Sequence, residues 1–231
     1  MTAISNARPV SLWMDRLSED LIPRASLQGD TETDIAIIGG GFSGLWTAYY
    51  LLERDPSLRV LIVEKEYCGF GASGRNGGWC EGGLAGGTEK YAKRSSLDEA
   101  LRLEHAMFAT VDEVQRVIES EKIDCGFQKG GVISIARNKP QAKRQLSAVE
   151  IARSRGFGED IFRLLEPEEA RNHLNATDIH SGIFFSPSAT IDPGRLVHGL
   201  ALAVESRGGK IVEGTTVYSF EEKKVSTSHG E

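Results

Sequence analysis

Two short apolar runs flank a helical pattern near the start of the chain. Residues 34–38 form a continuous apolar run with β-branched side chains, which is typical of a parallel strand buried on both faces. Residues 59–64 form a second run of this kind. Between them, apolar residues recur at three- and four-residue intervals: Leu45, Ala48, Tyr49 and Leu52. This spacing predicts an amphipathic helix that ends near Asp55-Pro56, and therefore a strand–helix–strand unit.

The middle of the chain mixes helical and strand patterns. Ser96 and Glu99 have the spacing of a capping box, which predicts the start of a helix there. Its apolar face comprises Leu97, Leu101, Phe108, Val111, Val114 and Ile118. We expect helices at 96–121, 140–155 and 166–171, and strands at 130–136 and 183–185. This region reads as α+β.

A second helix–strand pair follows. Asp192 is a good N-cap and Pro193 suits the first helical turn, so a helix is expected to run to Gly208-Gly209. Its buried face comprises Leu196, Val197, Leu200, Ala201 and Val204. Residues 210–213 are predicted to be the next parallel strand, and residues 220–231 resemble the first strand and turn of an unfinished β-meander.

These elements predict an α/β chain in three parts. Residues 1–30 form a polar N-terminal lead, in which Trp13 and Leu17 belong either to an amphipathic turn packed on the domain or to a substrate-side helix. Pro9 and Pro23 also lie in this lead. Residues 31–90 and 190–231 are predicted to form a Rossmann-like domain, and residues 91–189 to form an α+β segment.

The turn after the first strand carries a nucleotide-binding pattern. Gly39, Gly41 and Gly44 fit G-x-G-x-x-G, in which glycines allow a tight turn, close approach of a pyrophosphate and close helix packing. Glu64 ends the second strand twenty residues after Gly44, where an acid accepts hydrogen bonds from ribose hydroxyls. A plain glycine turn is the alternative, but the flanking elements favour a dinucleotide site.

A glycine-rich segment at residues 68–79 distinguishes between dinucleotides. A nicotinamide-binding unit would normally enter another helix here, so that interpretation is weaker. The small residues let the backbone lie against a planar or charged ligand, while Ser73, Arg75 and Asn76 carry polar groups suited to a flavin. A flexible surface loop is the alternative.

Composition and charge narrow the function classes further. The 231 residues are 40% hydrophobic and 26% charged, as in an ordinary soluble chain, and the net charge of −6 argues against a nucleic-acid partner. No secretory signal or membrane-spanning run is evident, and three cysteines without a C-x-x-C pair fit a reducing cytosol, so a cytoplasmic protein is expected. The five histidines lack metal-ligand spacing, so no metal is expected.

The chain resembles FAD-dependent amine and amino-acid oxidoreductases of the D-amino-acid oxidase and glycine oxidase type, nearest to γ-glutamylputrescine-oxidase-like proteins. The resemblance rests on residues 34–44, on Glu64, on the string 71–78 and on residues 191–196. It implies a glutathione-reductase-like FAD-binding domain, in which residues 91–189 are an inserted substrate or cap segment. The cofactor-binding residues that the pattern and the resemblance together indicate are Gly39, Gly41, Phe42, Ser43, Gly44, Glu64, Lys65, Ala72, Ser73, Arg75, Asn76, Gly77, Gly78 and Val217.

The resemblance implies oxidation of the C–N bond of a small amine or amino acid, by hydride transfer to flavin N5, imine hydrolysis and reoxidation by oxygen. A flavin dehydrogenase with another acceptor, or an FAD-binding fragment without turnover, stays open. No catalytic residue is predicted, and the oligomeric state is undetermined. Val217 either contacts the adenine or packs in the core, and Cys80 is more simply a small buried residue than a covalent flavin link or redox thiol.

By comparison with the family, the chain looks truncated, with its sheet incomplete. Such a sheet exposes edges and apolar faces, so marginal stability or aggregation of this segment is expected.

Overall fold

The computed structural model describes residues 11–17 and 21–231; Pro9, in the predicted lead, lies outside the described residues. The chain divides into two compact units. The first comprises residues 1–78, 117–126 and 191–231, and the second comprises residues 79–116 and 127–190. Each unit has its own sheet and its own hydrophobic clusters.

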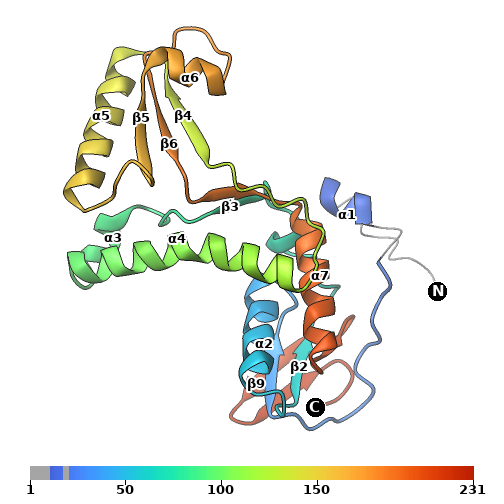
Figure 1. Ribbon diagram of the computed structural model, residues 1–231. Helices are drawn as coiled ribbons and strands as arrows, with labels where there is room; N and C mark the ends of the chain where they lie inside the picture. The colour runs from blue at the N-terminus through green and yellow to red at the C-terminus, as the bar shows by residue number, and fades with distance from the viewer. Residues whose placement is uncertain (1–10, 18–20) are drawn as a thin grey trace. The chain divides into compact units, whose positions relative to one another are not determined.

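The first unit is built on a three-stranded parallel sheet in the order β1-β2-β8 (Figure 1). Ile37 pairs with Ile62, which in turn pairs with Ile211. The elements of this unit are α1 (Leu12–Leu17), β1 (Ile35–Ile38), α2 (Phe42–Arg54), β2 (Val60–Val63), η1 (Ala72–Gly74), α7 (Pro193–Ser206), β8 (Lys210–Val212), β9 (Val217–Glu221) and β10 (Lys224–Thr227). The predicted strand–helix–strand unit and the returning helix and strand are therefore confirmed.

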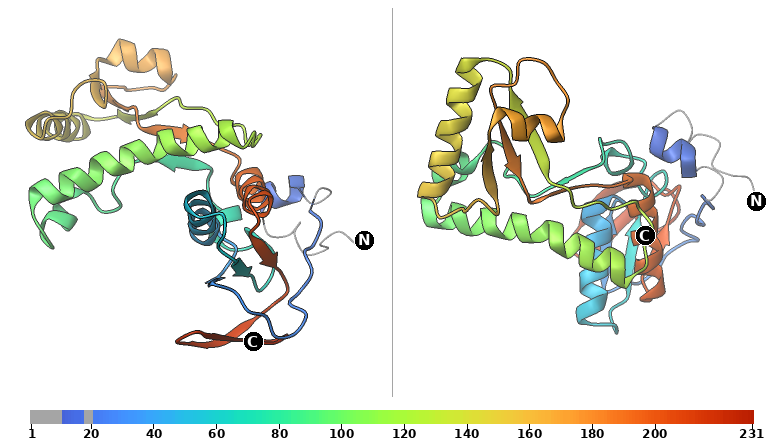
Figure 2. Two further views of the ribbon diagram at one scale, coloured as in Figure 1. Left: turned by 60° about the horizontal axis from the view of Figure 1, so that its bottom comes forward. Right: turned by 45° about the horizontal axis from the view of Figure 1, so that its top comes forward.

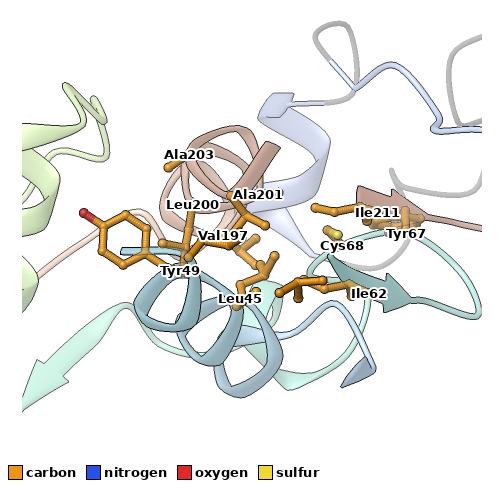
Figure 3. Close-up of a cluster of buried hydrophobic side chains, with 14 of the residues drawn as sticks. Leu45, Tyr49, Ile62, Tyr67, Cys68, Val197, Leu200, Ala201, Ala203 and Ile211 are labelled. Carbon is orange, nitrogen blue, oxygen red and sulfur yellow. The ribbon is translucent and has the colours of Figure 1, made fainter. Parts of the chain in front are cut away.

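Helices α2 and α7 pack together and against one face of this sheet (Figure 3). The side chains predicted to be buried on α2 are buried, and so are those predicted on α7. Tyr49 and Leu200 are fully enclosed between the two helices, and Ile62 reaches the same cluster from β2. Burial of this apolar stripe is the main stabilisation that either helix receives.

Strand β1 differs from its prediction. Burial alternates along it, and Ile38 is 50% exposed, so the strand is not buried on both faces. In contrast, all four residues of β2 are buried. The reason is what covers each face: Ile35 and Ile37 pack on the helix side, whereas the cluster on the opposite face covers Leu61 and Val63 of β2 and does not include Ile38. Within the described residues, the outer edge of β1 pairs with no strand.

The lead and the C-terminal hairpin lie side by side (Figure 2). The backbone N–H of Gly29 donates to His229 O at 2.9 Å, and that of Thr31 donates to Glu231 O at 2.9 Å. Strands β9 and β10 form the antiparallel hairpin itself. In the lead, Met14 and Leu17 of α1 are buried in the cluster of α2 and α7, which is the first of the two arrangements predicted for this segment.

The second unit holds a three-stranded antiparallel sheet in the order β4-β6-β5 and a two-stranded ribbon of β3 and β7. Its aromatic cluster includes Phe108, Phe157 and Phe185. The elements are β3 (Trp79–Glu81), α3 (Thr88–Ala92), α4 (Leu97–Ser120, of which the last turn belongs to the first unit), β4 (Val132–Ala136), α5 (Lys139–Ser154), β5 (Phe162–Leu165), α6 (Pro167–His173), β6 (Ser181–Phe185) and β7 (Ser188–Thr190).

The main helices and strands predicted for this unit are present, and the Ser96 hydroxyl caps Glu99 N at 3.2 Å. Leu97, however, is 48% exposed rather than part of the buried face, because Ala100 and Glu104 occupy the buried positions of that end of α4. The strands β3, β5 and β7 and the helix α3 were not predicted, since they are only three to five residues long.

No helix in the described part of the chain is both long enough and apolar enough to span a membrane.

Candidate functional site

The glycine turn follows β1 directly and requires its glycines. Gly39 adopts φ of 102°, in the left-handed region that favours glycine. A Cβ at Gly44 would lie 2.1 Å from Gly39 O, and a Cβ at Gly40 would lie 2.6 Å from Cys68 Sγ. In contrast, a Cβ at Gly39 would meet no heavy atom within 4 Å. The turn is therefore tight on its inner side and open at Gly39.

Helix α2 begins at this turn and presents its N-terminus there. Its N-cap is Gly41, which supplies no side-chain cap. The N–H of Phe42 donates to Ser73 Oγ at 2.9 Å, whereas α-helix geometry leaves the N–H groups of Gly41, Ser43 and Gly44 without an intrahelical acceptor. These donors and the positive end of the helix dipole favour an anion.

Glu64 lies where β2 ends, and its carboxylate contacts this turn. Glu64 Oε2 accepts a hydrogen bond from Gly40 N at 2.7 Å, and Oε1 accepts one from Glu66 N at 2.8 Å. Its backbone is fixed as well, because Glu64 N donates to Val212 O and Thr215 N donates to Glu64 O. The tertiary structure thus joins the glycine turn to the acid predicted to bind ribose.

The glycine-rich segment, for which a flexible surface loop was the alternative, folds into a short ordered loop around η1. The Asn76 side chain holds it, since Nδ2 donates to Ala72 O and Ser73 O, while Oδ1 accepts from Gly78 N at 2.8 Å. Arg75 Nε donates to Gly71 O at 3.3 Å, and its guanidinium lies 4.9 Å from the Phe70 ring centroid. The Asn76 side chain therefore shapes the loop, and the Ser73 hydroxyl joins the loop to the start of α2.

The remaining predicted residues also lie in the first unit. Lys65, Ala72 and Gly77 are exposed, and Gly78 is buried. Val217 is partly buried, and its side chain packs against Leu27, Leu61 and Val63.

Sequence reasoning assigned no function to two residues of the lead that hold the loop. Ser11 Oγ donates to Gly74 O at 2.7 Å, and Trp13 Nε1 donates to Asn76 O at 2.9 Å. These partners are 63 positions apart in the chain, so no local pattern indicates the contacts. The lead therefore contributes to the geometry of the candidate site.

Burial raises the pKa of the Cys68 thiol, and the nearby carboxylate of Glu213 raises it further. Cys80 is partly buried, and burial raises the pKa of its thiol as well. Both thiols are therefore poor nucleophiles at neutral pH.

The arrangement fits the ADP part of a dinucleotide. An open glycine turn, a helix N-terminus whose N-cap is a glycine and a carboxylate at the next strand end are the groups that pyrophosphate and ribose require. Comparison with known proteins agrees: the sequence model of the family described as FAD dependent oxidoreductase (DAO) matches residues 34–231. The chain belongs to this family of FAD-dependent flavoproteins.

Among individual relatives, the probable oxidoreductase OrdL of Haemophilus influenzae is 32% identical over 82% of this chain and 43% of its own length. The γ-glutamylputrescine oxidoreductase of Escherichia coli is 29% identical over 83% of this chain and 44% of its own length. The crystal structure of glycine oxidase from Bacillus cereus matches 86% of this chain and 52% of its own, with a TM-score of 0.65 and 25% identity. The chain spans about half the length of the relatives it matches.

Proposed function

We propose that the first unit binds FAD, with the pyrophosphate at the N-terminus of α2 and the adenosine ribose on Glu64. The observation that carries this proposal is that the end of β2 and the glycine-rich segment both bond to the glycine turn at the start of α2. Gly40 N donates to the Glu64 carboxylate, and Phe42 N donates to the Ser73 hydroxyl. The full set proposed to contact FAD is Gly39, Gly41, Phe42, Ser43, Gly44, Glu64, Lys65, Ala72, Ser73, Arg75, Asn76, Gly77, Gly78 and Val217.

The loop around η1 has a defined part in this proposal. The Asn76 side-chain amide bonds to backbone oxygens within the loop, and the Ser73 hydroxyl accepts from Phe42 N of α2, so the loop offers the cofactor chiefly its backbone. Arg75 is exposed and carries a guanidinium that suits a phosphate or negative charge on a reduced flavin ring. Arg75 thus supplies the positive charge of the loop, while Asn76 fixes its shape.

The whole protein is proposed to oxidise the C–N bond of a small amine or amino acid. This rests on the family membership and on relatives named for glycine and for γ-glutamylputrescine. When bound, FAD would accept the hydride from the substrate carbon, leaving an imine that water hydrolyses. Oxygen is the proposed final acceptor, and another electron acceptor is the alternative.

The test is an absorbance spectrum of the purified chain, followed by denaturation and chromatography of any released cofactor. We expect an oxidised flavin spectrum and released FAD, either as purified or after incubation with FAD. Peroxide formation with a panel of primary amines, secondary amines and D-amino acids then tests the reaction. A folded chain that takes up no FAD would contradict the proposed site.

Glu64→Gln provides a matched variant for the ribose contact. The amide removes the negative charge but keeps the size of the side chain, so FAD affinity is expected to fall about tenfold. Glu66→Gln is its control, because that side chain is exposed and Glu64 contacts only the backbone N–H of Glu66. Equal loss of affinity in both variants would argue against a specific role of Glu64.

A further inference from the structure

Glu213 is a buried carboxylate at the end of β8, only 4% exposed. Its Oε1 accepts a hydrogen bond from Cys68 N at 2.9 Å and another from Arg24 Nη1 at 3.1 Å, and its Oε2 accepts one from Arg24 N at 2.9 Å. Burying a carboxylate is costly unless donors surround it. Three donors do so here, and one of them is the backbone of the segment that enters the glycine loop.

Arg24 supplies the balancing charge. Burial alone would lower the pKa of Arg24, but its hydrogen bond to Glu205 and the nearby Glu213 carboxylate hold that pKa above its usual value. The contact with Glu205 is bidentate, at 2.7 Å and 2.8 Å. Arg24 therefore has two carboxylate partners, of which only Glu213 also touches the loop.

Cys68 connects this network to the glycine turn. Its neighbour Gly69 donates its N–H to Gly40 O at 3.0 Å, and Cys68 Sγ would lie only 2.6 Å from a Cβ at Gly40. Gly40 in turn donates to Glu64. A displacement of the backbone at Cys68 would consequently disturb both Gly40 and the carboxylate proposed to bind ribose.

We infer that Glu213 is a positioning residue of the cofactor site, because its buried carboxylate fixes the backbone at Cys68 and so holds residues 66–78 against the glycine turn. This inference rests on the proposed FAD site. Glu213 is too buried to meet the cofactor itself, and it acts through Cys68 and Gly40. The sequence identified Glu213 only as the end of a strand.

The test compares Glu213→Gln with Glu205→Gln in the 231-residue chain. Both variants replace a carboxylate bonded to Arg24 by an isosteric amide, but only the first alters an acceptor of Cys68 N. Hydrogen exchange of residues 66–78 is measured without FAD. We expect exchange about tenfold faster in Glu213→Gln and changed less than about twofold in Glu205→Gln.

FAD affinity is the second measurement, made by titration on the same variants. Glu213→Gln is expected to weaken FAD binding about tenfold, and Glu205→Gln less than about twofold. Both variants are expected to lower the Tm by similar amounts. Equal effects of both variants on the loop and on FAD would overturn the inference, because they would show a merely structural role.

A further variant, Glu213→Asp, keeps the charge beside Arg24 but shortens the reach to Cys68. This variant is used if Glu213→Gln does not fold. Its rate of hydrogen exchange in residues 66–78 is expected to lie between that of the wild type and that of an unfolded chain. Unchanged exchange in Glu213→Asp would contradict the inference. If the folded wild type bound no FAD, the proposed function would fail, whereas the exchange measurement would still decide whether Glu213 holds the loop.

Discussion

Glycines of the turn after β1 and of the glycine-rich segment differ in what an added methyl group would meet. A Cβ at Gly44 would lie 2.1 Å from the backbone oxygen of Gly39 and 3.2 Å from Ile37, whereas a Cβ at Gly71 would meet no heavy atom within 4 Å. Backbone atoms cannot move aside as easily as the end of a flexible side chain. Close packing of α2 on β1 therefore depends on glycine at position 44.

Gly44→Ala is expected to lower the free energy of unfolding by about 2 kcal/mol, because the clash with Gly39 O outweighs the gain in helix propensity. Denaturant unfolding of the chain without FAD measures this. Gly71→Ala is the control, since Gly71 has an ordinary φ of −73° and open space around it, and its change should stay within about 0.5 kcal/mol. Equal values for the two variants would contradict the prediction.

Asp34 makes stability depend on acid pH. The guanidinium and the backbone N–H of Arg59 donate hydrogen bonds to the Asp34 carboxylate and lower its pKa from 3.8 to about 2. Because the folded pKa lies below the unfolded one, this contribution is present above about pH 4 and is lost as the pH falls from about 4 through 2. The Tm difference between wild type and Asp34→Asn should therefore shrink over that range. A difference that is constant from pH 6 to pH 2.5 would refute this.

Among the elements, α7 shows how a local cap fixes the start of a helix. Asp192 Oδ1 accepts a hydrogen bond from Arg195 N at 3.0 Å, and Pro193 occupies the first turn. The helix then buries its apolar face against α2 (Figure 3). Its N-terminus is therefore specified by residues three positions apart, whereas its stability depends on packing.

Asp192→Ala is expected to cost about 1 kcal/mol of stability, because the N–H of Arg195 loses its side-chain acceptor. Urea unfolding followed by circular dichroism measures the change. Asp192→Asn is the matched control, since asparagine caps a helix about as well, and it should retain most of the stability. Loss of the same size in both variants would mean that the charge, rather than the cap, is what matters.

At the scale of the whole molecule, apolar side chains remain uncovered on the first unit. Ile38 is 50% exposed, Phe220 is 72% exposed, and both line a hollow of about 880 Å³ beside β1 and β2. The outer edge of β1 pairs with no strand in the described part of the chain. Exposed edges and apolar patches of this kind promote association between chains.

The chain is therefore expected to self-associate at micromolar concentration, as measured by sedimentation velocity. The double variant Ile38→Thr with Phe220→Ser should shift it toward the monomer by removing apolar surface. Leu146→Thr is the control, because Leu146 is similarly exposed, at 45%, but lies on α5 in the other unit. A wild type that stays monomeric and melts cooperatively would contradict this prediction.

The sequence by itself determined the elements that depend on neighbouring residues. Apolar spacing predicted the buried face of α2, Asp192 and Pro193 predicted the start of α7, and the glycine turn followed by Glu64 predicted the dinucleotide site. The family and its FAD dependence were also correctly predicted, from the resemblance carried by residues 34–44, Glu64, residues 71–78 and residues 191–196. The pattern behind each predicted element lies within about twenty-five residues, where local geometry limits the possible structures.

Only the tertiary structure decided which distant groups meet. The bonds of Ser73 to Phe42 and of Glu213 to Cys68 join residues 31 and 145 positions apart. Tertiary structure also decided that one face of β1 is exposed, because the cluster on that side of the sheet covers Leu61 and Val63 of β2 and does not include Ile38. The periodicity of a sequence indicates which side of a helix or strand is apolar. Whether another element covers that side, and which one, depends on the packing of the whole chain.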